Sequence, residues 1–114
     1  MIAVIFEFTP ADGRFTDYKE LAEGLGEDVA KFDGFVSIER FESLTTKGKV
    51  LSLSFWRDEE AVRAWRNLEV HRGAQAKGRG GVFADYRLRV ASVLRDYGMK
   101  ERAEAPGDSR AKHG

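Results

Sequence analysis

Residues 54–75 constrain the fold of this chain more than any other stretch. Up to Trp56 the chain is a mostly apolar run, as in the end of a β-strand, and beyond it the apolar residues take helical spacing. Asp58 stands at the change, where its carboxylate can accept hydrogen bonds from the free amides of a first helical turn. Glu59 and Glu60 add negative charge at the positive end of the helix dipole. A strand therefore ends near Trp56, and an amphipathic helix begins at Asp58.

The predicted helix carries one inward stripe. Residues spaced i, i+3, i+4 and i+7 share a face. The stripe consists of Ala61, Ala64, Trp65, Leu68, His71, Arg72 and Gln75. A face that ends in Trp, His and Gln is either an ordinary core with a polar rim or the wall of a pocket. The residue types alone leave both interpretations open.

The rest of the chain alternates between strand and helix patterns. The predicted elements are a strand at 1–9, a helix at 15–32, strands at 35–44 and 49–56, a helix at 58–77 and a strand at 82–95. In the second strand, alternation places Phe35, Ser37, Glu39 and Phe41 on one face. The order β-α-β-β-α-β predicts an α+β, ferredoxin-like fold, in which one antiparallel sheet carries two helices on one face.

The other face of that sheet needs a cover, and the chain has no third helix to supply it. The first and third strands are apolar on both sides, so this face carries apolar groups. An exposed apolar face of several hundred square ångströms marks an interface. We therefore expect a homodimer that packs through this face.

Length and charge exclude several classes of protein. The 114 residues suit one domain, and 19 acidic residues balance 19 basic ones, which argues against a general nucleic-acid binder. Without cysteine the chain has no disulfide and no thiolate metal site. No stretch approaches the ~20 apolar residues that span a membrane. No secretory signal is visible, because Glu7 interrupts the first strand, so we expect a cytoplasmic protein.

The helix and its flanks resemble the antibiotic biosynthesis monooxygenase family. The resemblance rests on Phe55-Trp56, Glu60-Ala61, Trp65 and His71-Arg72, with a second patch at Asp85-Tyr86-Arg87. It implies a dimeric α+β barrel over residues 1–97. The polar residues 98–114, which include Pro106 and Gly107, are predicted to form a flexible tail.

Metal and haem chemistry are not expected. The chain has two histidines, one of them in the tail, and no spaced metal-ligand motif. Residues 78–81 are glycine-rich, but they follow a helix and therefore read as its stop instead of a phosphate loop. In the haem-degrading branch of the family, the resemblance implies a proximal His ten residues after the helix Trp. That position is Gln75, although His71 lies one turn earlier.

The candidate site lies between the sheet and the helices. His71 is the candidate proton acceptor, because an imidazole titrates near neutrality, and Trp65 is the second candidate catalytic residue. The candidate substrate-binding residues are Trp65, Leu68, Gln75, Glu7 and Tyr86. Each has a plainer interpretation: Trp65 as core, His71 as a solvated residue near a helix end, and Glu7 as a strand-end group. Tyr86 and Arg87 are predicted to point to opposite faces of the last strand.

The predicted function follows from the family resemblance together with these residues. It is a monooxygenase that needs no metal, flavin or other cofactor and oxidises a small aromatic or hydroquinone-type molecule with dioxygen. The substrate anion would itself reduce dioxygen, so the protein would supply only a cavity, a proton acceptor and orientation. The alternative is a dimeric α+β barrel without catalytic activity, which binds a small hydrophobic ligand or acts as an accessory protein. Haem degradation is the third and least favoured function.

Overall fold

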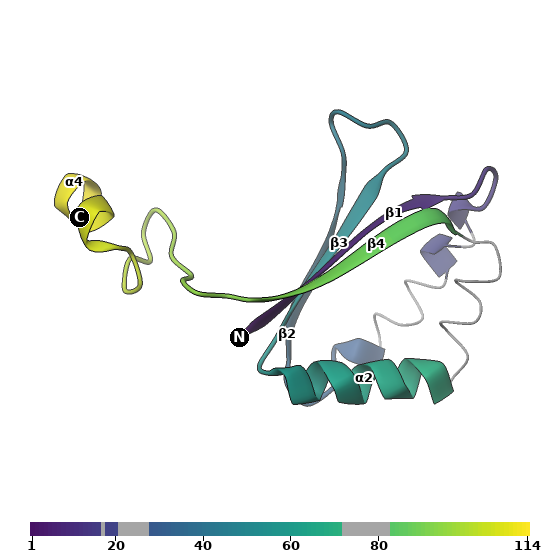
Figure 1. Cartoon of the computed structure of the whole chain (residues 1–114), viewed down its shortest axis with the longest axis horizontal. Coiled ribbons are helices and arrows are strands. Elements are labelled where there is room, and N and C mark those ends of the chain that lie inside the picture. Colours follow the sequence, from purple (N-terminus) through teal and green to yellow (C-terminus); the bar gives the residue numbers. More distant parts are fainter. Residues whose placement is uncertain (17, 21–27, 72–82) are drawn as a thin grey trace.

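The computed structural model describes residues 1–16, 18–20, 28–71 and 83–114. These residues form one antiparallel sheet, a long helix against it and a short C-terminal helix (Figure 1). The elements are strands β1 (Ile2–Pro10), β2 (Phe35–Glu42), β3 (Val50–Trp56) and β4 (Phe83–Ser92), and helices α2 (Glu59–His71) and α4 (Gly107–His113). Of the helix expected over 15–32, the described residues 15–16, 18–20 and 28–29 are helical. The predicted α+β class is confirmed.

The sheet has the strand order β2-β3-β1-β4, with every neighbouring pair antiparallel. Val4 of β1 lies between Ser54 and Val90, and Glu7 lies between Leu51 and Arg87. Directly opposed residues share a face of the sheet, whereas successive residues alternate between the two faces. One face, here called the helix-bearing face, therefore carries the even-numbered residues of β1. The odd-numbered residues of β1 lie on the other, open face.

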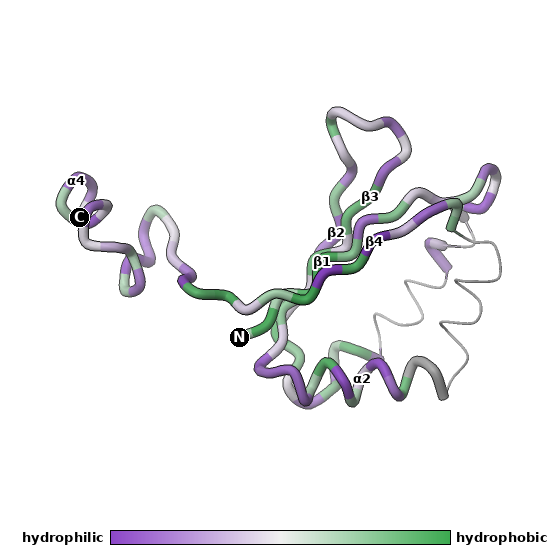
Figure 2. Tube along the Cα trace, in the orientation of Figure 1, coloured by the Kyte–Doolittle hydropathy of each residue, from purple (hydrophilic) through white to green (hydrophobic). Residues whose placement is uncertain are grey.

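Apolar residues gather where the sheet meets α2. Figure 2 shows hydrophobic residues concentrated in the strands, whereas hydrophilic and hydrophobic residues alternate along α2. The inward side of α2 buries Ala61 and Trp65 and half-buries Leu68. Ala64, which was assigned to the same stripe, is exposed, so the inward face is narrower than the periodicity predicted.

The predicted faces of β2 are wrong at its first residue. The register of β2 against β3 shifts between Phe35 and Ser37. This irregularity turns Phe35 to the helix-bearing face, where its ring packs edge-on to Trp56 at a centroid distance of 5.5 Å. Simple alternation fails here because an extra residue in one strand reverses the side-chain parity that precedes it.

Beyond β4 the chain leaves the sheet. The strand ends at Ser92, three residues earlier than predicted, and Figure 1 shows the chain leading away from the sheet to α4. Arg102 organises this segment: it donates hydrogen bonds to the carbonyls of Gly98 and Gly114, at 3.1 and 2.8 Å, and to the Ser109 hydroxyl at 2.6 Å. The sequence pattern did not predict α4. The flexibility of residues 98–114 stays a prediction.

Neither α2 nor α4 is long and apolar enough to cross a membrane, and no other described helix is. α2 begins one residue after Asp58, as its capping signal predicts. The predicted end of this helix at residue 77 and its glycine-rich stop at 78–81 lie outside the described residues.

Candidate functional site between the sheet and helix α2

The start of α2 is fixed by contacts on both sides. The Asp58 carboxylate accepts a hydrogen bond from the Ala61 amide at 2.9 Å, as expected for an N-cap. Arg57 binds both carboxylate oxygens of Asp33 at 3.1 and 3.3 Å. Gly34 has a φ of +89° and accepts a 2.7 Å hydrogen bond from the Arg57 amide. Together these contacts tie the turn before β2 to the junction between β3 and α2, which sets where Trp65 lies.

Trp65 belongs to a buried group that we call the Trp cluster. Its buried members are Val29, Trp56, Ala61 and Trp65, with Leu68 and several strand residues packed around them. The Trp65 ring centroid lies 6.2 Å from that of Trp56 and 5.3 Å from that of Phe32. Trp65 is therefore core for most of its surface, with 8% exposed. Leu68 lies beside it, as predicted.

A second group, the Phe8 cluster, packs on the same face toward the other end of β1. It consists of Phe8, Tyr18 and Val50, with Phe6 and Phe83 against them. Phe8 and Tyr18 have ring centroids 4.4 Å apart. Tyr86 borders this cluster, 5.6 Å from Phe6 and 6.1 Å from Phe83 between centroids, and it is 43% exposed. The structure thus places Tyr86 on the same face as Trp65 but in a different cluster.

Between the two clusters lies a strip of short or exposed side chains, here called the central strip. Its members are Ser52 and Ser54 of β3, and Leu88 and Val90 of β4. Ser54 is buried, and its Oγ accepts a 2.9 Å hydrogen bond from Trp56 Nε1. Leu88 and Val90 are 52% and 44% exposed. Serine fills less space than the β-branched residues usual on a half-buried strand, so the central strip carries less side-chain volume than the aromatic clusters on either side of it.

Tyr18 brings a protic group to this region. Burial raises the pKa of its phenol, while the nearby Arg40 guanidinium opposes the rise. The phenol therefore stays neutral at physiological pH and can donate a hydrogen bond. Neither Tyr18 nor the two serines was selected from the sequence. The signal for the serines was present as two small polar residues at alternate positions of an otherwise apolar strand.

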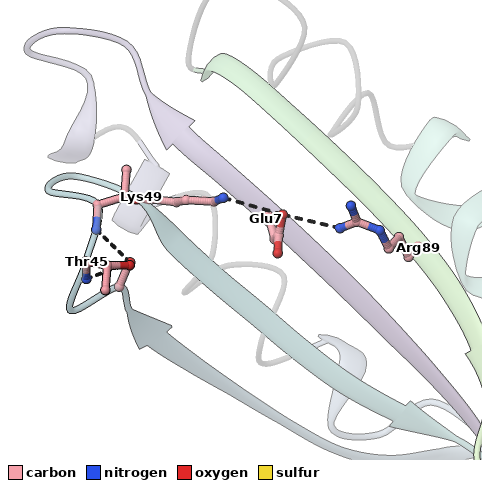
Figure 3. A network of polar contacts seen from close by, with 6 residues as sticks. Glu7, Thr45, Lys49 and Arg89 are labelled. Atoms are coloured by element: carbon pink, nitrogen blue, oxygen red, sulfur yellow. Dashed lines mark hydrogen bonds and ion pairs between the residues drawn. The ribbon is translucent and has the colours of Figure 1, made fainter.

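Glu7 lies on the opposite, open face of the sheet. Its Oε2 contacts Arg89 Nη1 at 3.3 Å and Lys49 Nζ at 3.5 Å (Figure 3). The hydrogen bond from Arg89 and the positive charge of Lys49 lower the pKa of this carboxyl, so Glu7 is ionised at neutral pH. The sheet therefore separates Glu7 from Trp65, and the structure does not bring these two predicted site residues together.

The other predicted groups fall at the edge of the described region. α2 ends at His71, whose backbone is helical, but the side chain of His71 lies outside the described residues. Gln75 lies outside them altogether. Within the described ranges, no group of three or more His, Asp or Glu side chains is placed to hold a metal ion.

Comparison with known proteins agrees with this architecture. Residues 1–77 match the family described as antibiotic biosynthesis monooxygenase. The chain belongs to this family. The family resemblance noted at Phe55-Trp56, Trp65 and His71-Arg72 is thereby confirmed, and so is the predicted ferredoxin-like fold.

Two relatives show how the family match extends along the chain. Jasmonate monooxygenase ABM of Pyricularia oryzae is 47% identical over 93 residues, which cover 82% of this chain and 43% of the relative. The chain thus spans less than half the length of that protein. YqjZ of Bacillus subtilis, described as uncharacterized, is 32% identical over 93 residues, which cover 82% of this chain and 79% of the relative.

A solved structure shares the fold at low sequence identity. SnoaB of Streptomyces nogalater, a cofactor-independent oxygenase, superimposes with a TM-score of 0.71 at 12% identity. The match covers 83% of this chain and 94% of SnoaB. At this identity the likeness establishes the shared fold.

Proposed function

We propose that this protein is a monooxygenase that oxidises a small, largely apolar molecule with dioxygen on the central strip. The observation that carries the proposal is the placement of that strip between two aromatic clusters, in a chain that belongs to a monooxygenase family. Aromatic side chains around a few polar groups are the usual lining of small-molecule sites. One oxygen atom would enter the substrate, and the other would leave as water.

The proposed chemistry needs no metal or flavin. A phenol or hydroquinone that loses its proton becomes an anion rich enough in electrons to reduce dioxygen itself. The protein would hold the substrate against Trp65 and the serines, exclude water and accept the proton. His71 is our candidate proton acceptor. It is the last residue of α2, and imidazole titrates near neutrality. The relatives named as a jasmonate monooxygenase and a cofactor-independent oxygenase support oxygenase activity of this kind.

The jasmonate-oxidising relative widens the set of substrates to be tested. At 47% identity, its named substrate is a reasonable candidate for this chain as well. The test is oxygen uptake by the purified protein, after treatment with a chelator, in the presence of phenols, hydroquinones or, together with a two-electron reductant such as a reduced nicotinamide, jasmonate. We expect uptake with at least one of these that Trp65→Phe reduces and that Leu44→Ala, a change at a fully exposed loop residue, leaves intact. Saturable binding without oxygen uptake would instead support the ligand-binding alternative.

We also propose that two copies pack through the open face. Ile5, Leu51, Leu53 and Phe55 all lie on this face and are only half-buried in the single chain. One row across the face runs from Glu39 on β2 through Leu53 and Ile5 to Arg89 on β4. Two sheets stacked about a twofold axis could therefore bring the acidic edge of one copy to the basic edge of the other.

Sedimentation tests this arrangement. The protein should behave as a particle of about twice the 12.8 kDa chain mass. Leu53→Glu should dissociate it, because the new carboxylate would be buried against apolar groups. Leu44→Glu is the matched control, since Leu44 is fully exposed in a loop, and it should leave the dimer intact. A monomeric wild-type protein at micromolar concentration would contradict the proposal.

A further inference from the structure

Arg40 places a positive charge at the edge of the central strip. It lies on β2 directly opposite Ser52, which in turn lies opposite Phe6. Arg40, Ser52 and Phe6 thus form one row across the helix-bearing face, and β2 is an edge strand of the sheet (Figure 1). A guanidinium at this point borders both the serines and the Phe8 cluster.

Arg40 differs from Arg57 and Arg89 in its polar contacts. Arg57 binds the carboxylate of Asp33, and Arg89 binds that of Glu7. Arg40 instead lies near the Tyr18 phenol, and its positive charge opposes the rise in the pKa of that phenol. Among the residues that the structure describes, no carboxylate lies within ion-pair distance of it.

Arg40 and Tyr18 can both donate hydrogen bonds to a ligand. Tyr18 packs with Val50, and Val50 lies opposite Glu42, which follows Arg40 on the same face of β2. The guanidinium of Arg40 has five N–H donors in a planar fork, and the phenol of Tyr18 has an O–H that can donate. A charged fork beside a neutral hydroxyl donor suits a carboxylate, which accepts two parallel hydrogen bonds from arginine.

We propose that Arg40 and Tyr18 form a carboxylate subsite, so that the preferred ligands are apolar monocarboxylic acids. The carboxylate would lie at the β2 edge, and the apolar body would extend over Ser52 and Ser54 toward β1. Strands are ~4.8 Å apart, so a ligand that reaches from β2 to β1 is about 10 Å long. This inference deepens the proposed function and rests on it for the location of the ligand.

Binding of acids and their methyl esters tests the proposal without requiring turnover. Isothermal titration would use 4-hydroxyphenylacetate, 1-naphthylacetate and dodecanoate, each beside its methyl ester. Wild-type protein should bind at least one acid more tightly than its ester. Arg40→Met should weaken the binding of that acid by about ten-fold, which is the effect of a lost charge-assisted hydrogen bond. The affinity for the ester should not change. Tyr18→Phe should weaken the acid by a smaller factor.

Three further variants separate charge from geometry. Arg40→Lys keeps the charge and loses the fork, so it should restore part of the preference for the acid. Arg63→Met removes an exposed arginine of α2 and should change neither ligand. Glu42→Gln removes the negative charge on the next row of the same face. The affinity for the acid should rise, because this charge repels the ligand carboxylate. Circular dichroism should show that each variant is folded.

The outcomes are distinct from those of the oxygen-uptake test. If acids bind with an Arg40-dependent preference and no oxygen is consumed, the subsite stands and the oxygenase proposal fails. If no acid is preferred over its ester, or Arg40→Met weakens acid and ester equally, the subsite is refuted, whatever the enzymatic activity.

Discussion

Among the glycines that the structure describes, Gly34 is the one where an added methyl group should destabilise the fold most. A Cβ at Gly34 would lie 2.5 Å from the Ala61 Cβ, far inside van der Waals contact, and the backbone φ there is +89°. The left-handed conformation costs an L-residue about 1–2 kcal/mol. Overpacking against Ala61 adds about 1–3 kcal/mol. Gly34→Ala should therefore lower the free energy of unfolding by about 2–5 kcal/mol, the sum of these two costs.

Gly48 provides the matched control. Its φ is +82°, and a Cβ there meets nothing within 4 Å. Gly48→Ala should therefore cost only the conformational term, about 1–2 kcal/mol. Urea unfolding at one fixed protein concentration, followed by fluorescence of the buried Trp56 and Trp65, measures both variants.

A third variant tests the assigned contact directly. Ala61→Gly removes the methyl group that Gly34→Ala would strike, at a helix-propensity cost of about 1 kcal/mol. In the double variant the two changes should partly compensate, giving a favourable coupling energy. Equal losses for Gly34→Ala and Gly48→Ala, or strict additivity with Ala61→Gly, would refute the claim that the Gly34 turn packs tightly against the start of α2.

The remaining predictions concern the N-cap, acid stability and Trp65. Asp58→Ala should lower the urea midpoint. Asp58→Asn keeps a capping oxygen, so its urea midpoint should stay close to that of the wild-type protein. The pKa values of Glu7, Asp33 and Asp58 are lowered from 4.5, 3.8 and 3.8 by their partners, so the stability they confer is present at neutral pH and lost as pH falls through the lowered values. The urea midpoint should thus fall below about pH 4.5, and less steeply in Arg57→Gln, because Asp33 and Asp58 then lose the ion-pair partner that they share. Trp65→Phe should cost about 1–2 kcal/mol of stability and reduce oxygen uptake with the dimer intact, whereas unchanged uptake would make Trp65 a core residue alone.

The parts of the fold with local signals were predictable from the sequence. Asp58 caps an amide three residues away, so its role depends on neighbouring residues alone. Trp65 and Leu68 share a helical face with Ala61 by spacing. The α+β class and the antiparallel sheet followed from the succession of elements, because right-handed crossovers allow few alternatives.

The parts that depend on pairing between distant segments were not predictable in the same way. Phe35 changes face because of an irregularity in how β2 pairs with β3. Glu7 pairs with Arg89, 82 residues later, so its open-face ion pairs had no local signal. Ser52 and Arg40 meet only through the register of two strands. Similarly, α4 is held by hydrogen bonds from Arg102 to Gly98, Ser109 and Gly114. These contacts follow no periodicity in the sequence.

Incorporation of isotopically labelled oxygen tests the proposed function most directly. Purified, chelator-treated protein would be incubated under ¹⁸O₂ with a substrate that supports oxygen uptake, and the product would be analysed by mass spectrometry. A monooxygenase should place one ¹⁸O atom in the product, with Trp65→Phe reducing the yield and Leu44→Ala leaving it unchanged. Product without ¹⁸O, or the same labelled yield in a reaction without protein, would contradict the assignment of a monooxygenase site to the central strip.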